Sequence, residues 1–158
     1  MLLLRRAPVD KTKLRFLNVL VVEDHPGMRS IIRAVLQSMG IHSVIETADG
    51  IQAIQELNSR NLSWVSGHLS IEEHRSIDFI IADWNMPNMS GIELLSQVRR
   101  NSNWLPLPFM MLTAENSKEQ IIQAVNLGVN DYIVKPFTAH LLEAKIKSLL
   151  ESKFEDLK

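Results

Sequence analysis

Acidic, hydroxyl and ammonium side chains follow directly after four apolar runs of this sequence. They are Glu23-Asp24, Asp83, Thr113 and Lys135. If the four runs are strands of one open parallel sheet, their carboxyl ends meet in one crevice, where three carboxylates, one hydroxyl and one ammonium converge. Three carboxylates repel one another unless a cation joins them, and ligands that are all oxygen suit Mg²⁺. Lys135 then offers positive charge, and Thr113 a hydrogen-bond donor, to a phosphoryl group.

Asp83 is the residue expected to react. A carboxylate beside Mg²⁺ and a lysine acts as a nucleophile toward a phosphoryl donor and forms an aspartyl phosphate. Asp83 stands alone after its strand, whereas Glu23 and Asp24 form a pair suited to metal. Taken singly, Asp24 and Thr113 also fit as helix caps, Asp83 as a turn residue and Lys135 as a solvated side chain. Their joint position at four strand ends favours a site.

The elements that would position these residues alternate strictly between strand and helix. Helical periodicity separates the apolar runs, and a Gly ends the first helix. This alternation predicts an α/β fold, with a doubly wound, five-stranded parallel sheet covered by helices on both faces. The predicted strands are Phe16–Val22, His42–Glu46 at an edge, Phe79–Ala82, Leu107–Leu112 and Asp131–Val134, and the helices centre on Met28–Met39, Asp49–Arg60, Ile92–Val98, Ile121–Val125 and Leu142–Leu150.

The segment Asn61–Ile77 is longer than the few residues that such a connection needs. Because it follows a helix and precedes a strand, we expect it at the amino ends of the strands, opposite the ligand crevice. Its apolar residues favour a loop that folds back onto the body. It also contains His68, Glu72, Glu73 and His74, for which a solvated charged turn is favoured over a metal cluster. His25 is likewise interpreted as a surface histidine, since a hard cation prefers oxygen.

Composition limits the partners and the compartment. The net charge of −1 suggests neither nucleic acid nor an anionic membrane as a partner. The chain has no cysteine, which excludes disulfides and thiolate metal sites and favours the cytoplasm. The start MLLLRRAPVDKTK lacks the order of a signal peptide and the length of a membrane span. Residues 1–13 are expected to form a flexible arm, and residues 14–158 one domain with the insertion at 61–77.

The motifs VLVVEDHPGMR, ADWNMPNMSGIELL, MLTAEN and DYIVKPFTA, in this order, resemble the receiver domains of two-component response regulators. The likeness extends over about Leu14–Leu150 and is closest to the single-domain chemotaxis regulators. It implies a flavodoxin-like sheet of order 2-1-3-4-5 and phosphorylation of Asp83 by a histidine kinase. It further implies Mg²⁺ on Asp24, Asp83 and the backbone carbonyl of Asn85, with Glu23 reaching the ion through water.

The resemblance also implies how the signal leaves the domain. Thr113 and Tyr132 match the residues that report phosphorylation to the outer face. A surface of Lys118, Ile121, Tyr132, Val134 and Lys145 matches the motor-docking positions of the chemotaxis type. The expected protein is a monomeric switch without enzymatic turnover beyond its own phosphorylation and dephosphorylation. Its partners would be a kinase, the flagellar motor switch protein or another output protein, and a phosphatase that resets it.

Other interpretations remain open at this point. A stand-alone receiver also serves as a phosphorelay shuttle or a phosphate sink, and the apolar residues of the docking surface also fit core or dimer contacts. An aspartate-dependent phosphatase would have a second acid two residues after the nucleophile, where this chain has Asn85. A flavin carrier would have a phosphate-binding loop after the first strand, where EDHPG offers acids that repel phosphate. The departures from the family pattern are Glu23 in place of aspartate, Ser90 before Gly91, and the insertion.

Overall fold

Five parallel strands form the centre of the computed structural model, in the order β2-β1-β3-β4-β5. The structure describes residues 10–61, 76–114 and 117–154. The strands are β1 (Asn18–Val22), β2 (Ser43–Thr47), β3 (Phe79–Asp83), β4 (Phe109–Thr113) and β5 (Asp131–Val134). Each neighbouring pair is parallel. The predicted fold class and strand order are confirmed.

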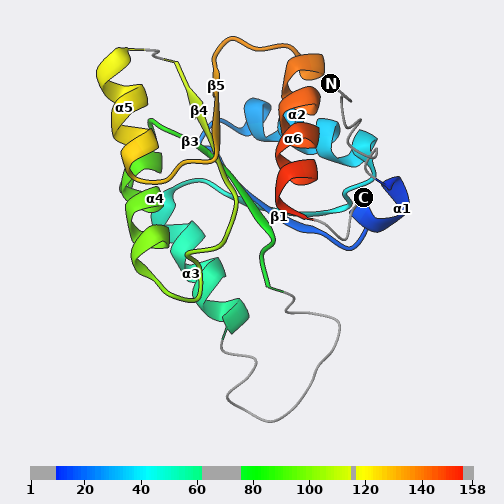
Figure 1. Ribbon diagram of the computed structural model, residues 1–158, viewed down its shortest axis with the longest axis horizontal. Helices are drawn as coiled ribbons and strands as arrows, with labels where there is room; N and C mark the ends of the chain where they lie inside the picture. The colour runs from blue at the N-terminus through cyan, green and yellow to red at the C-terminus, as the bar shows by residue number, and fades with distance from the viewer. Residues whose placement is uncertain (1–9, 62–75, 115–116, 155–158) are drawn as a thin grey trace, which may run out of the picture.

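Helices cover both faces of this sheet (Figure 1). One face carries α2 (Pro26–Met39) and α6 (Ala139–Lys153), and the other carries α3 (Gly50–Asn61), α4 (Gly91–Arg100) and α5 (Lys118–Asn126). Side chains alternate along β1, so that Val19 and Val21 pack under α2 and α6 while Leu20 and Val22 pack under the other three helices. Two apolar cores, one on each face, hold the sheet in place.

The inner strands β1, β3 and β4 are buried along their whole length, whereas the edge strand β2 is largely half-buried. This explains why the inner strands read as continuous apolar runs and β2 alternates. Burying a Val, Leu, Ile or Phe side chain stabilises the fold by roughly 1.5–3 kcal/mol. The polar residues that end buried strands are therefore held on a rigid platform.

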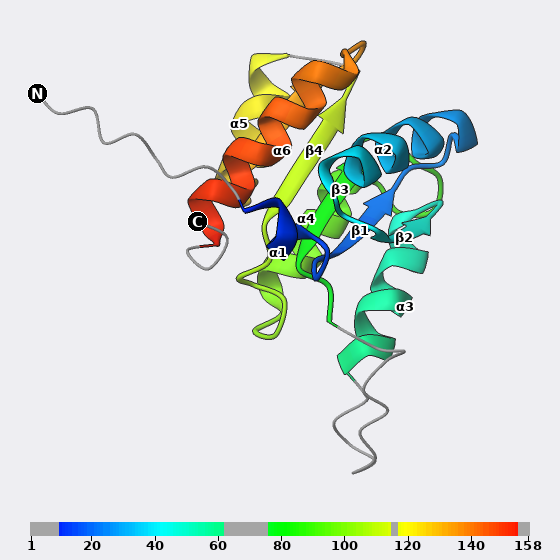
Figure 2. The ribbon, with the colours of Figure 1, turned by 90° about the vertical axis from the view of Figure 1, so that its right-hand side faces the viewer.

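The N-terminal segment begins, where the structure describes it, with the helical turn α1 (Lys11–Leu14), which Asp10 caps. Leu14 is buried in the core beneath α2 and α6, beside Leu17. Of the arm predicted over residues 1–13, residues 1–9 lie outside the described residues. Figure 2 shows α1 beside the sheet, at the start of β1.

Residues 62–75 of the predicted insertion, including His68, Glu72, Glu73 and His74, also lie outside the described residues. Its ends belong to the body: Asn61 is the last residue of α3, and Ile77 is 5% exposed. The Asn18 side chain donates to the carbonyl oxygen of Ser76, and the Asn18 amide donates to Asp78. Both ends therefore lie on the amino side of the strands.

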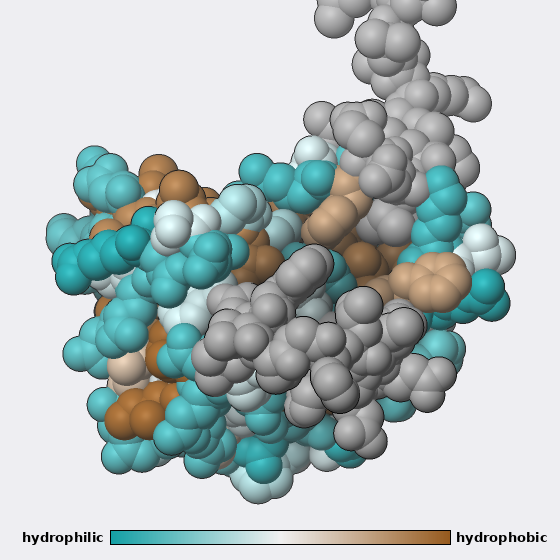
Figure 3. Space-filling model, turned by 90° about the horizontal axis from the view of Figure 1, so that it is seen from below, coloured by the Kyte–Doolittle hydropathy of each residue, from teal (hydrophilic) through white to brown (hydrophobic). Residues whose placement is uncertain are grey.

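Figure 3 views the molecule from this amino side, where apolar side chains are visible among polar ones. Exposed apolar residues that precede strands include Phe16, before β1, and Leu105, before β4.

None of the described helices is long and apolar enough to cross a membrane. The acidic residues of interest lie at the other end of the sheet, at the carboxyl ends of the strands.

Candidate functional site

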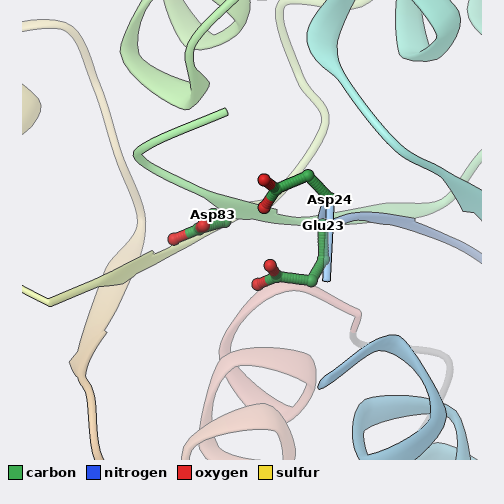
Figure 4. Close-up of side chains that lie close together, drawn as sticks. All are labelled: Glu23, Asp24 and Asp83. Atoms are coloured by element: carbon green, nitrogen blue, oxygen red, sulfur yellow. The ribbon is translucent and has the colours of Figure 1, made fainter. Parts of the chain in front are cut away.

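Three carboxylates meet at the carboxyl ends of β1 and β3 (Figure 4). Glu23, Asp24 and Asp83 each offer a carboxylate oxygen, and these oxygens lie within 4.8 Å of one another. The register of the strands causes this, because Val22 at the end of β1 pairs with Ala82, one residue before Asp83. Glu23 and Asp83 are buried, at 1% and 6% exposure, while Asp24 is exposed. The cluster therefore has two fixed members and one that faces solvent.

Lys135, which follows β5, supplies positive charge to this cluster. Its Nζ lies 2.9 Å from Oε2 of Glu23 and 3.2 Å from Oδ1 of Asp83. Its backbone amide donates to the carbonyl oxygen of Thr113 over 2.7 Å, which holds the end of β5 against the end of β4. The four predicted strand ends thus converge as expected. Lys135 joins two carboxylates from two different strands.

Burial dominates the electrostatics of the two enclosed acids. Desolvation raises the pKa of Asp83, against the lowering effect of Lys135, and it raises the pKa of Glu23, against the hydrogen bond from Lys135. Burial alone would lower the pKa of Lys135, but its hydrogen bond to Glu23 and the charge of Asp83 outweigh this and raise it. Both carboxylates are held where an added cation would relieve the cost of their ionisation.

The donor set fits a hard divalent cation. All three side chains offer carboxylate oxygens, and the exposed Asp24 leaves the cluster open to solvent. A small ion such as Mg²⁺ keeps several waters and takes one or two carboxylates, so a half-open cluster suits it better than a closed cage would. Asn85, whose carbonyl was also predicted to contribute, lies two residues beyond Asp83 in the loop before α4, where its side chain is exposed.

The two helices that follow β1 and β4 are capped by other residues than Asp24 and Thr113, which also fitted as caps in the sequence. His25 caps α2, because its Nδ1 accepts a hydrogen bond from the Met28 amide, and Ser117 caps α5. Asp24 and Thr113 therefore cap neither helix. His25 is exposed, as predicted for a surface histidine.

Gly91 sets the distance between β3 and the start of α4. A Cβ on this residue would lie 2.1 Å from the backbone oxygen of Asp83, closer than atoms can approach. The Gly91 amide donates to the carbonyl oxygen of Trp84. Only glycine allows α4 to begin this close to the end of β3.

Sequence reasoning missed several residues that hold the site in place. Arg29 donates from Nη1 to the carbonyl oxygens of Glu23 and Asp24, over 2.7 and 3.3 Å. Asp49 accepts a hydrogen bond from Asn88, 39 positions away along the chain. An aspartate before a helix signals an N-cap, but nothing in the sequence pairs it with Asn88.

The predicted switch and partner residues lie on β4, α5, β5 and α6. Tyr132 and Val134 lie on the edge strand β5, Lys118 begins α5, and Ile121 is half-buried one turn later. Lys145 of α6 forms an ion pair with Asp131 over 3.1 Å, and its Nζ lies 5.7 Å from the centre of the Tyr132 ring. Thr113 is buried at the end of β4, and it pairs with Val134. These elements are adjacent in the fold (Figure 1).

Comparison with known proteins places this geometry in context. Residues 19–147 match the family model described as the response regulator receiver domain. The chemotaxis protein CheY of Pseudomonas aeruginosa is 40% identical over 135 residues, which cover 85% of this chain and 97% of that protein. The chemotaxis protein CheY-3 of Vibrio cholerae is 38% identical, with 85% and 92% covered.

Solved structures agree with these matches. The chemotaxis protein CheY4 of Vibrio cholerae, crystallised at low pH, superposes with a TM-score of 0.70 at 30% identity and covers 85% of this chain and 98% of its own. A response regulator structure from Chloroflexus aurantiacus gives a TM-score of 0.69 at 26% identity, with 91% and 98% covered. The sequence and fold comparisons thus point to the same kind of domain.

Proposed function

The chain belongs to the response regulator receiver family, and we propose that it is a signalling switch that a histidine kinase activates by phosphorylating Asp83. The observation that carries this proposal is the convergence of three carboxylates and Lys135 at one edge of the sheet. A kinase of this type works where ATP is available, so the proposal places the protein in the cytoplasm.

In the proposed reaction, a carboxylate oxygen of Asp83 attacks the phosphorus atom of a phosphohistidine. The new oxygen–phosphorus bond forms as the phosphorus–nitrogen bond breaks, and the imidazole of the kinase leaves and takes up a proton. Lys135 already contacts Asp83, so its ammonium stands where it can pair with the incoming phosphoryl oxygens. Thr113, at the end of the neighbouring strand β4, is the proposed hydroxyl donor to a phosphoryl oxygen.

Glu23, Asp24 and Asp83 would hold Mg²⁺, with the Asn85 carbonyl as a further ligand. When bound, the ion supplies positive charge that offsets the negative charge of the phosphoryl group and the acids. Arg29 keeps the backbone of Glu23 and Asp24 in place through its two hydrogen bonds to their carbonyl oxygens. The polypeptide thus provides a nucleophile in Asp83, an ammonium in Lys135, and the acid pair of Glu23 and Asp24 for the metal.

The proposed output is a change at Tyr132. Thr113 moves toward the phosphoryl group and vacates space for the tyrosine ring, which turns inward. The surface of Lys118, Ile121, Val134 and Lys145 would then accept a protein partner, an amphipathic helix with an acidic edge. The chemotaxis relatives favour the flagellar motor switch protein as this partner.

Transfer of labelled phosphate from a phosphorylated histidine kinase to the purified protein tests the proposal. We expect transfer that requires Mg²⁺, acts on the wild type and fails on Asp83→Asn. The output is tested by calorimetry with the amino-terminal peptide of the motor switch protein, with and without beryllofluoride. Activation should tighten binding about tenfold, a typical coupling of about 1.4 kcal/mol. Equal affinities in both states would place the partner elsewhere.

A further inference from the structure

The loop between Asp83 and α4 is held from one side by the junction of β2 and α3. The Asn88 side chain donates from Nδ2 to Oδ2 of Asp49 over 2.8 Å, and the Gly50 amide donates to the carbonyl oxygen of Met89 over 3.2 Å. In the described part of the chain, these are the hydrogen bonds that join residues 85–89 to another element. The middle of the loop therefore depends on this junction for its position.

The backbone of Asn88 has a left-handed conformation, which few residue types adopt readily. Its φ of 66° lies in the left-handed region, and among the described residues it is the one non-glycine residue there. Asn tolerates this region better than most residues do. Many loops use glycine for such a turn, but glycine has no amide side chain to reach Asp49.

Asp49 is equally specialised, because its two carboxylate oxygens have different tasks. Oδ1 accepts from the Gln52 amide in the first turn of α3, while Oδ2 accepts from Asn88. The residue is 6% exposed, and these two hydrogen bonds keep the pKa of its carboxyl below the usual range. Serine would satisfy the helix cap alone. Aspartate has a second carboxylate oxygen, and in Asp49 this oxygen accepts the hydrogen bond from Asn88 in the loop.

We propose that Asp49 and Asn88 are positioning residues for the metal site, acting through the loop that carries Asn85. The inference rests on the proposed function, in which the backbone carbonyl of Asn85 is a ligand of Mg²⁺. Asn85 lies between Asp83, which β3 fixes, and Asn88, which Asp49 fixes. When the Asn88 bond is lost, the carbonyl samples more positions, and part of the binding free energy is used to order it.

Two single variants and their combination test the pair. Asn88→Gly keeps the left-handed backbone and removes the amide, and Asp49→Ser keeps the cap of α3 and removes the oxygen that meets Asn88. Gln52→Ala is the matched control, because Gln52 accepts from the Ala48 amide in the same junction without reaching the loop. Mg²⁺ binding is followed by tryptophan fluorescence, to which Trp84 contributes directly beside Asp83, and the titration midpoints are compared at a temperature well below each unfolding transition.

Each single variant should raise the Mg²⁺ midpoint by about tenfold, and the double variant should show the same shift, because both changes break one interaction. Gln52→Ala should leave the midpoint unchanged. Unchanged midpoints in Asn88→Gly and Asp49→Ser, or shifts that add in the double variant, would overturn the inference. Failure of the proposed function looks different: the wild type itself would then lack a Mg²⁺ response that depends on Asp24.

Discussion

The ammonium of Lys135 lies 3.2 Å from the carboxylate of Asp83, and the two residues extend from strand ends that β4 separates. Lys135 also reaches Glu23, so one ammonium neutralises part of the charge of the two buried acids of the cluster. The same position that stabilises the resting acids is the position from which a lysine would meet a phosphoryl group. This dual use makes Lys135 the sharpest residue for separating metal binding from phosphorylation.

Replacing Lys135 by Met should affect the two processes in opposite directions. Loss of the ammonium leaves Glu23 and Asp83 without their partner, so Mg²⁺ should bind more tightly. Phosphorylation by acetyl phosphate at saturating Mg²⁺ should slow by about 10²-fold, since a group aimed at developing charge is lost. Fluorescence titration and the rate of adduct formation measure the two effects. Weaker Mg²⁺ binding in Lys135→Met would show that the lysine supports the metal site and does not compete with it.

Replacing Asp83 by Asn should stabilise the protein when Mg²⁺ is absent. The variant removes a buried carboxylate whose charged form is disfavoured by burial and by the charge of Asp24, although it also loses the contact with Lys135. We expect a gain on the order of 1 kcal/mol in the free energy of unfolding at pH 7, measured by urea denaturation. Asp131→Asn, at an acid that is half-exposed, is the control. A less stable Asp83→Asn protein would contradict this reasoning.

This difference should depend on pH in a defined direction. Because the pKa of Asp83 is raised above its ordinary value of 3.8, the folded state holds the proton more tightly than the unfolded state does. The stability that the protonated acid contributes is complete below that value and is lost as the pH rises through the raised pKa. The advantage of Asp83→Asn should therefore be smallest near pH 4 and grow toward neutral pH. The free energy of unfolding is measured for both proteins across this pH range. A constant difference between the two would refute the raised pKa of Asp83.

Replacing Gly91 by Ala should destabilise the fold, even though Ala is the better helix former. The new Cβ would meet the Asp83 carbonyl oxygen at 2.1 Å, so β3 and α4 must move apart. A loss of about 1–3 kcal/mol is expected, as for other overpacked sites. Gly27→Ala in α2 is the comparison, because its Cβ would meet no backbone atom and only the side chain of the His25 cap, with Cε1 at 3.0 Å and Nδ1 at 3.3 Å. Equal stability of the two variants would show that α4 adapts without strain.

The positions of the candidate site residues could be predicted from the sequence, because they follow from topology. Once the apolar runs are identified as parallel strands, the residues after Val22, Ala82, Leu112 and Val134 must share one edge. In the structure, Lys135 lies within 3.2 Å of both Glu23 and Asp83. Carboxylate oxygens of Glu23, Asp24 and Asp83 lie within 4.8 Å of one another. The burial of each strand and the alternation in β2 also follow from local pattern.

The hydrogen bonds around the site could not be predicted in this way. The pair of Asp49 and Asn88 joins two loops, and loops carry no periodicity that fixes which residues meet. His25 and Ser117 cap α2 and α5, although Asp24 and Thr113 precede the same helices and are also of capping types. Residues 62–75 lie outside the described residues, but topology alone predicts that the segment begins and ends at the amino side of the strands.

Replacing residues 62–75 by a short Gly-Ser loop should leave the phosphorylation rate within a fewfold of the wild type. Both ends of the segment lie at the amino side of the strands, while the acids lie at the carboxyl side. Residues 76–78 are kept, because Ser76 and Asp78 bond to Asn18 and Ile77 is buried. Acetyl phosphate kinetics on the folded variant measure the effect. A loss of rate of a hundredfold would mean that the segment reaches the site.

The mass of the intact protein after incubation with acetyl phosphate and Mg²⁺ tests the central claim most directly. The wild type should gain the mass of one phosphoryl group, and the gain should be lost when EDTA is present. Asp83→Asn should gain nothing under the same conditions, and Asp131→Asn should gain as much as the wild type. An equal gain on Asp83→Asn, or a wild type that gains no mass with Mg²⁺ present, would contradict the assignment of Asp83 as the phosphoryl acceptor.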